Sequence, residues 1–375
     1  MFSLKVLHVG EYVKGGVATY INEVTSYQNK HNDISEVYLM VSKNYSDKQY
    51  SLNRENIIFY DYLRKPGYIL KAIFDVHKAI NRIKPDIVHV HSTFAGIFVR
   101  IPFFMKKSKP KIIYCSHGWS FLMDVSKKSK IAYSIVERAL ARKTDLIVNI
   151  SKNEQNKSLQ YKLPINKSIV IYNGISEKVS KNAVSLEISI DPHKINVLFV
   201  GRFDKQKGLD ILIDFFNKYP NKKISLYLIG DGVLDNQHLD IPENVINIGW
   251  VDNYKLDSYY QMFDAIIMPS RWEGFGLVAV EAMKNKKPVI VSNIGALPEL
   301  VKEEVNGYVF DLDNYERLNE IFNSMNKEAL TRLGENGYRI YKDNFTSEIM
   351  NNKIVNEYKN LLGISVKQIE KERII

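Results

Sequence analysis

The sequence predicts an α/β protein made of two doubly wound, Rossmann-like domains that face each other across a cleft. Three observations predict this fold class. Short β-branched runs alternate with helical patterns over the first 175 residues, the alternation stops at residues 176–194, and it then resumes up to about residue 344. Alternating strands and helices are typical of βαβ units, which build a parallel sheet covered by helices on both faces. The length of 375 residues fits two to three domains, since domains average roughly 150 residues.

The first domain is expected at residues 1–175. Its strands are predicted at Lys5–Val9, Glu36–Val41, Ile57–Tyr60, Asp86–His91, Lys111–Ser116, Asp145–Ile150 and Ile169–Tyr172. Helical patterns lie between them at Val17–Gln28, Tyr68–Ile83 and Ile131–Arg142. Residues 176–194 show no convincing period and end in Asp-Pro-His, so we interpret them as an interdomain linker.

The second domain is expected at residues 195–344. Its strands are predicted at Val197–Val200, Ser225–Ile229, Val245–Ile248, Ala265–Met268, Val289–Val291 and Tyr308–Phe310, and its helices at Lys207–Lys218, Asn253–Met262 and Leu277–Asn285. The last fifty residues have a mostly helical pattern, and residues 345–375 are expected to form the carboxyl-terminal helices. Ligands of such sheets bind beyond the carboxyl ends of the strands, so the loops that follow the strands are the candidate sites.

The composition excludes several protein classes. The chain has one cysteine, Cys115, which rules out a disulfide framework and a cysteine-based zinc site within one chain. The amino terminus lacks the pattern of a signal peptide, and the least charged long stretch, Ile87–Met105, carries two histidines, an arginine and a proline. We therefore expect a cytoplasmic protein without a membrane-spanning helix.

Positive charge is concentrated in the first half of the chain. Lys and Arg number 52 and Asp and Glu number 42, which gives a net charge of +10. Residues 1–190 hold 29 basic and 15 acidic residues, a net of +14, and the remainder holds 23 and 27, a net of −4. Basic clusters lie at Lys106–Lys111, Lys127–Lys130 and Arg138–Lys143. This asymmetry indicates an anionic partner, which can be a membrane surface, a phosphorylated substrate or nucleic acid. A solvated basic face is the alternative.

A glycine pair follows the first predicted strand. Gly15 and Gly16 stand directly before an amphipathic helical pattern. Glycines allow backbone N–H groups to approach an anion, and a helix N-terminus favours negative charge. The segment is therefore either a phosphate site or simply a tight turn.

Two cations follow the first strand of the second domain. Arg202 and Lys207 lie in a loop that opens a helix. A guanidinium and an ammonium beside a helix N-terminus suit a diphosphate, whereas the alternative is a pair of solvated loop charges.

A third loop, at Pro269–Met283, follows the strand Ala265–Met268. Glu273 lies in this loop, and Glu281 lies eight residues later in the helix that follows. Either carboxylate can accept hydrogen bonds from sugar or ribose hydroxyls. The residues between them that can bring backbone amides close to a ligand are Gly274, Phe275, Gly276 and Leu277. Because Glu281 has apolar neighbours, it needs a partner, and a structural ion pair is the competing explanation.

His117 follows the strand Lys111–Ser116 and therefore also lies at a carboxyl end. Gly118 and the apparently exposed Trp119 and Ser120 favour a site there. By contrast, His89 and His91 lie in an apolar strand and are expected to be core residues.

Taken together, the segments GGV, SHGWS, YNGI, GRFDKQKG and PSRWEGFGLVAVEAM resemble the nucleotide-sugar glycosyltransferases of family 4, the "glycosyl transferases group 1". The resemblance covers nearly the whole chain in the expected order, and its most specific part is the pair of glutamates separated by seven residues. The family has the GT-B fold and retains the anomeric configuration of the transferred sugar.

The resemblance implies a role for each matching residue. Gly15 and Gly16 would approach the donor's β-phosphate, and Arg202 and Lys207 would hold its diphosphate. Glu273 would bind hydroxyls of the transferred sugar, with backbone amides at Gly274, Phe275, Gly276 and Leu277, and Glu281 would bind the ribose. His117 would lie near the sugar, Asn173 and Gly174 would close the first domain, and the last helix would cross back onto that domain.

The resemblance also implies chemistry without a metal or other cofactor. Fixed cations stabilise the leaving diphosphate, so no metal is required, and the Asp311-Leu312-Asp313 sequence is not interpreted as a metal motif. The expected donor is a UDP-sugar. The expected acceptor is a lipid-linked or other glycan of a surface polysaccharide, such as lipopolysaccharide or capsule, reached by peripheral binding to an anionic membrane.

Other functions remain as alternatives at this point. They are transfer to a soluble acceptor, sugar-nucleotide epimerisation and glycan phosphorolysis. A dinucleotide oxidoreductase would need a GxGxxG motif, and a nucleic-acid-binding protein would need a recognition motif; neither pattern is present. We therefore expect no nucleic-acid partner.

Overall fold

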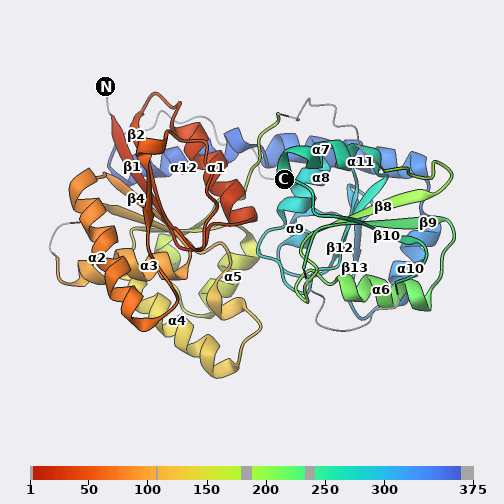
Figure 1. Cartoon of the computed structure of the whole chain (residues 1–375), viewed down its shortest axis with the longest axis horizontal. Helices are drawn as coiled ribbons and strands as arrows, with labels where there is room; N and C mark the ends of the chain where they lie inside the picture. Colours follow the sequence, from red (N-terminus) through yellow and green to blue (C-terminus); the bar gives the residue numbers. More distant parts are fainter. Residues whose placement is uncertain (1–2, 107–108, 179–187, 233–240, 365–375) are drawn as a thin grey trace. The chain divides into compact units, whose positions relative to one another are not determined.

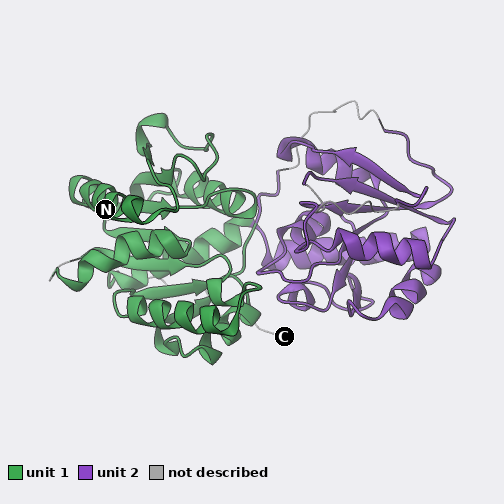
Figure 2. Cartoon of the chain, turned by 60° about the horizontal axis from the view of Figure 1, so that its bottom comes forward, with its two compact units in different colours: residues 1–174, 347–375 green, residues 175–346 purple. Residues whose placement is uncertain are grey.

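In the computed structural model, the structure describes residues 3–106, 109–178, 188–232 and 241–364 (Figure 1). The chain forms two compact units (Figure 2). Unit 1 comprises Met1–Gly174 together with Ser347–Ile375, and unit 2 comprises Ile175–Thr346. Residues 179–187 of the expected linker and residues 365–375 of the expected carboxyl-terminal segment lie outside the described residues. The last helix, α12, thus returns to unit 1, as the predicted fold requires.

Unit 1 is built on a parallel sheet with the strand order β3-β2-β1-β4-β5-β6-β7. Its strands are β1 (Leu4–Gly10), β2 (Ile34–Ser42), β3 (Ile57–Tyr60), β4 (Ile87–His91), β5 (Lys111–Cys115), β6 (Leu146–Asn149) and β7 (Ser168–Val170). Its α-helices are α1 (Gly16–Gln28), α2 (Pro66–Ile83), α3 (Thr93–Arg100), α4 (Lys127–Ala141), α5 (Lys152–Gln160) and α12 (Ser347–Leu361).

The two faces of this sheet have different characters. On β1 and β4, Leu7, Val9, Val88 and Val90 belong to an apolar core that includes α2 and α3. Because alternate residues of a strand point to opposite faces, the histidines between them point toward the face covered by α1 and α12. The buried histidines of the two strands, His8, His89 and His91, therefore lie together under these two helices.

Unit 2 repeats the design with the strand order β10-β9-β8-β11-β12-β13, again fully parallel. Its strands are β8 (Ile195–Val200), β9 (Ile224–Ile229), β10 (Val245–Gly249), β11 (Ala265–Met268), β12 (Val289–Ser292) and β13 (Gly307–Phe310). Its helices are α6 (Leu209–Lys218), α7 (Asn253–Met262), α8 (Leu277–Lys284), α9 (Leu297–Leu300), α10 (Tyr315–Ser324) and α11 (Lys327–Asn344). In both sheets the strand order reverses beside the first strand, β1 or β8, which is the position where such folds bind ligands.

The predicted strands agree with the observed ones to within two residues at each end. Helix α5 was not predicted, because its sequence KNEQNKSLQ has almost no apolar residues and its buried side chains are Glu154 and Ser158. No helix in the described part of the chain is long and apolar enough to cross a membrane.

Candidate active site

The structure brings together two residues that the sequence analysis placed in separate loops of unit 2. Strands β8 and β11 are parallel neighbours, so the loops at their carboxyl ends meet. The Nζ of Lys207, from the first loop, lies 2.7 Å from the Oε2 of Glu273, from the second. Both side chains are mostly buried, with exposed fractions of 19% and 12%. An ammonium and a carboxylate are thus held side by side at the end of the sheet.

Glycine and backbone hydrogen bonds explain why the two loops approach so closely. Gly208 caps the N-terminus of helix α6 with a φ of +72°, and a Cβ at this position would lie 2.1 Å from the carbonyl oxygen of Pro269. The backbone carbonyl of Gln206 accepts a hydrogen bond of 2.8 Å from the backbone N–H of Arg271. The side-chain amide of Gln206 donates to the backbone carbonyl of Trp272. The position of Lys207 is therefore fixed by both loops.

Arg202 lies in the same loop as Lys207 but is more accessible. Its guanidinium is 59% exposed and forms an ion pair of 2.9 Å with Asp204. It also donates to the side-chain carbonyl of Gln206. The loop holds this cation at the surface, where an incoming anion can compete with Asp204 for it.

Helix α8 (Leu277–Lys284) follows Glu273 after a short loop, residues 274–276. Gly276 caps it with a φ of +102°, and a Cβ there would lie 2.7 Å from Leu297. The side chain of Phe275 is buried against Phe345, so only the backbone of Phe275 can serve a ligand. The aligned peptide dipoles give the N-terminal end of a helix a partial positive charge.

Glu281 has a hydrogen-bond donor as its partner, and not the ion pair that the sequence left as an alternative. The hydroxyl of Tyr260 on α7 donates to its Oε2 at 2.8 Å. Nearby, Lys284 is paired with Asp257. Burial raises the pKa of Glu281 to about 7, although the hydrogen bond from Tyr260 opposes this shift.

In unit 1, His117 lies in a strained turn after β5. The φ angles of His117 and Gly118 are +53° and +112°. The turn is held by Glu154 of α5, whose buried carboxylate accepts hydrogen bonds of 2.8 Å from the hydroxyl of Ser116 and from the N–H of Gly118. A third bond comes from the N–H of Ile150.

One expectation about this turn is wrong. Trp119 is fully buried, and its indole N–H donates to the side-chain oxygen of Asn149. The indole thus packs in the core, and it does not support a binding role for His117. His89 and His91 are buried, as expected, but they also contact one another, His8 and, through His91, His117.

The remaining predicted residues of unit 1 are the glycine pair at the start of α1 and the pair Asn173 and Gly174. Gly15 precedes α1 with a φ of +55° and open space where a Cβ would be, and Gly16 is the first residue of the helix. Asn173 is buried, and the N–H of Gly174 faces the sulfur of Met350 on α12 at 3.1 Å.

Sequence reasoning missed Glu154, Tyr260, His8 and Gln28. For Glu154 a signal was present, because Ser151 and Glu154 have the spacing of a helix capping box, and the hydroxyl of Ser151 accepts from the N–H of Glu154. The other three could not be found in this way, because their partners come from distant parts of the chain.

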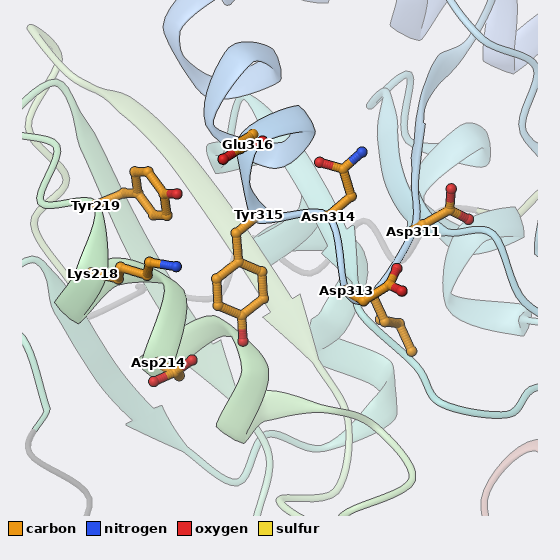
Figure 3. Close-up of a pocket in the computed structure, with 9 residues that line it drawn as sticks. Asp214, Lys218, Tyr219, Asp311, Asp313, Asn314, Tyr315 and Glu316 are labelled. Carbon is orange, nitrogen blue, oxygen red and sulfur yellow. The ribbon is translucent and has the colours of Figure 1, made fainter.

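A hollow in unit 2 does not coincide with this chemistry. It has a volume of about 660 Å³ and is lined by residues of α6, by Tyr219 directly after it, and by the segment 311–316 (Figure 3). Four of its lining side chains are acidic, namely Asp214, Asp311, Asp313 and Glu316, against one lysine, Lys218. Such a surface repels a diphosphate, so we place the candidate site at the ends of β8 and β11.

Two Rossmann-like units, each built on a fully parallel sheet, have the architecture of the GT-B fold. Comparison with known proteins then shows the class of protein, a glycosyltransferase. Residues 14–179 match the family model "Glycosyltransferase Family 4", and residues 182–340 match "Glycosyl transferases group 1". The chain belongs to glycosyltransferase family 4.

Three similar proteins illustrate the match. An uncharacterized 41.2 kDa protein in the cps region of Klebsiella pneumoniae is 36% identical over 350 residues, covering 90% of this chain and 96% of that protein. The UDP-Gal:alpha-D-GlcNAc-diphosphoundecaprenol alpha-1,3-galactosyltransferase of Escherichia coli is 27% identical over 302 residues, which is 73% of this chain and 76% of that enzyme. The crystal structure of HepE from Anabaena in complex with UDP-glucose has a TM-score of 0.75 and 19% identity, covering 95% and 100% of the two chains.

Proposed function

We propose that this glycosyltransferase transfers a sugar from a UDP-sugar to a lipid-linked acceptor, with retention of configuration, in the synthesis of a surface polysaccharide. The observation that carries the proposal is the pairing of Lys207 with Glu273 beside the N-terminus of α8. A cation, a carboxylate and a helix N-terminus then lie within reach of one nucleotide sugar.

The chemistry assigned to these residues follows from charge. Cleavage of the sugar–phosphate bond builds negative charge on the diphosphate, and Lys207 and Arg202 are positive groups already fixed by their loops. Preorganised charge of this kind stabilises a transition state more than a ground state. Glu273 would accept hydrogen bonds from the sugar, and Glu281 from the ribose. Because the carboxylate of Glu273 is paired with the ammonium of Lys207, it is less available for attack on the sugar. We therefore favour direct attack by the acceptor, assisted by the leaving phosphate, over a covalent glycosyl–enzyme intermediate.

The nucleotide and the acceptor are proposed from the relatives together with the charge pattern. HepE binds UDP-glucose, and the Escherichia coli relative is named for a UDP-galactose donor and a diphosphoundecaprenol-linked acceptor. A lipid diphosphate in an anionic membrane accounts for the net charge of +14 over residues 1–190, whereas a neutral soluble acceptor does not.

Helix α4 offers a surface of the right character for a membrane. Lys128, Ile131, Ile135, Arg138 and Arg142 are spaced three or four residues apart, so they share one side of the helix, and all five are exposed. Ile131 and Ile135 are 56% and 55% exposed. This α4 stripe combines apolar and basic side chains, as interfacial helices do.

The cluster Lys106–Lys111 is less suitable than the sequence suggested. Lys111 opens β5 at its amino end, whereas His117 follows the carboxyl end, so the cluster and His117 lie at opposite ends of this strand. Lys109 is also neutralised by Asp145. Lys107 lies outside the described residues.

The transfer reaction is tested with a panel of nucleotide sugars and a synthetic polyprenyl-diphosphate-linked sugar. We expect UDP release from one donor to rise when the acceptor is added, and NMR of the product to show the anomeric configuration of the donor. An inverted product would contradict retention. Equal transfer to a soluble sugar lacking the lipid would contradict the proposed acceptor.

Membrane binding is tested by co-sedimentation with anionic and neutral vesicles. We expect binding to anionic vesicles at low salt, loss of binding as salt rises, and weaker binding for Lys128→Glu/Arg138→Glu. The double variant Lys222→Glu/Lys223→Glu, which makes the same charge change on exposed residues of unit 2, is the control and should bind as the unmodified protein does. Equal loss in both variants would mean that only net charge matters, and the α4 stripe would be excluded.

A further inference from the structure

A continuous chain of hydrogen bonds runs from helix α12 to His117 beneath the two covering helices of unit 1. The side-chain amide of Gln28 donates to the hydroxyl of Tyr358 at 3.1 Å. Its Oε1 lies 2.8 Å from the Nε2 of His8, and the Nδ1 of His8 lies 3.0 Å from the Nε2 of His91. The Nδ1 of His91 lies 2.9 Å from the Nε2 of His117.

The buried members of this chain are uncharged. Gln28, His8, His91 and Tyr358 are fully buried. Burial lowers the pKa of His8 to about 4, that of His91 well below its usual value, and that of His117 to about 3. Each neutral imidazole carries one N–H and one bare nitrogen, so fixing the hydrogen on one ring fixes it on the next.

The amide of Gln28, oriented by its bond to the hydroxyl of Tyr358, sets the direction of the whole chain. Its Oε1 can only accept, so His8 must carry its hydrogen on Nε2 and leave Nδ1 bare. His91 then donates from Nε2 to His8, which leaves its own Nδ1 bare, and His117 donates from Nε2 to His91. The remaining nitrogen of His117, Nδ1, is 3.7 Å from the sulfur of Cys115, a thiol that can act as a weak donor.

We propose that Gln28 is a positioning residue which, acting through His8 and His91, fixes the orientation and tautomer of His117 so that its Nδ1 is a hydrogen-bond acceptor. This inference rests on the proposed function for its consequence, since His117 is expected to lie near the transferred sugar. In this tautomer Nδ1 of His117 can accept a hydrogen bond from a sugar hydroxyl in place of the weak Cys115 thiol, but His117 cannot act as an acid toward the sugar. The strained turn keeps the ring in place from the backbone side, through Glu154.

A bound transition-metal ion is the competing explanation for the histidines. The ligand atoms of His8, His89 and His91 lie within 4.8 Å of one another. A metal held by the Nε2 of His91 would move the hydrogen of that ring to Nδ1, and His117 would then have to accept on Nε2 and carry its own hydrogen on Nδ1. The two explanations thus predict opposite tautomers of His117. We favour the hydrogen-bonded chain, because each ring nitrogen of His8 and His91 already faces a partner at 2.8–3.0 Å.

The test is NMR of the protein labelled with ¹⁵N-histidine, which distinguishes the two neutral tautomers of each ring. We expect His117 to carry its hydrogen on Nε2 in the unmodified protein. In Gln28→Met and in Tyr358→Phe, where the direction of the chain is no longer set, we expect the ratio of the two tautomers of His117 to change about tenfold, as for the loss of one hydrogen bond. Tyr358→Phe is close to isosteric, so it serves if Gln28→Met does not fold.

Two control variants separate this effect from general damage. Tyr27→Phe removes a hydroxyl that bridges α1 and α12 through Asn352, outside the chain. Gln155→Met removes an amide that bonds the backbone of Ser168 in the same unit. Both should leave the tautomer of His117 unchanged. With a nucleotide sugar as donor, kcat/KM should fall about tenfold in Gln28→Met and Tyr358→Phe. The Kd for UDP should not change, because UDP lacks the transferred sugar.

Three results would overturn the proposal. They are a hydrogen on Nδ1 of His117 in the unmodified protein, stoichiometric metal by elemental analysis, and a tautomer that shifts in the variants while donor turnover stays the same. The NMR measurement needs no substrate. A failure of the proposed function, seen as absence of turnover with every donor, is therefore distinguishable from a failure of the positioning role.

Discussion

Replacement of Lys207 by Met tests the assignment of the diphosphate site most sharply. The substitution keeps most of the side-chain volume and removes the charge that lies 2.7 Å from Glu273. At an effective dielectric constant of about 20, two unit charges about 4 Å apart interact by about 4 kcal/mol. Loss of one preorganised group at a developing charge costs about 2.7–4 kcal/mol in measured cases. We therefore expect kcat to fall by about 10²–10³-fold.

The assay is steady-state release of UDP from the donor that the unmodified enzyme uses. Lys342→Met is the matched control, because Lys342 forms an exposed ion pair with Glu177 and should retain full activity. The melting temperature of both variants shows whether the fold is intact. A Lys207→Met enzyme that is folded and keeps its kcat within about threefold would refute the electrostatic reasoning.

Two further predictions concern buried carboxylates. Because the pKa of Glu281 is raised from 4.5 to about 7, the folded protein favours its protonated form, and this contribution to stability is lost as pH rises through 7. Between pH 5 and pH 8, the free energy of unfolding of Glu281→Gln should therefore rise relative to that of the unmodified protein by about 1–3 kcal/mol, as measured by denaturant unfolding. A difference that stays constant with pH would disprove the pKa shift. Titration at pH 8 should show that the variant binds UDP more weakly. Glu137 and Arg100 form a fully buried ion pair of 2.9 Å, so Glu137→Gln should lower the free energy of unfolding by about 3–5 kcal/mol. In Glu335→Gln, which affects an exposed pair with Lys286, the loss should stay below about 1 kcal/mol.

The fold could be predicted because its strands are short apolar runs separated by helical patterns. Strand β11 and helix α7 were predicted at their observed bounds. Helix α5 was missed because its inward face carries Glu154 and Ser158, so no apolar period reveals it. Its only signal is local, the capping pattern that starts at Ser151.

The two loops of the proposed donor site could be located in the sequence because each lies within one continuous stretch. The sequence could not predict which of these loops lie in contact. The contact between Lys207 and Glu273 depends on the neighbouring positions of β8 and β11 in the sheet. The same holds for the hydrogen-bonded chain to His117, since His8 meets His91 only because β1 and β4 are neighbouring strands.

The exposure of single side chains was the least predictable property. Trp119 was expected at the surface because it follows Gly118 in a loop, yet the chain turns inward there and buries the indole beside Asn149. A polar-looking loop sequence does not reveal which of its side chains point into the core.

The central claim is that the loops after β8 and β11 hold the nucleotide diphosphate. Amide hydrogen exchange with and without UDP tests it directly, because bound phosphates protect the N–H groups they contact. We predict slower exchange at Gly201–Gly208 and at Gly274–Leu277 when UDP is present, and no change at the hollow lined by residues 311–316. Binding of UDP without protection of either loop would contradict the account.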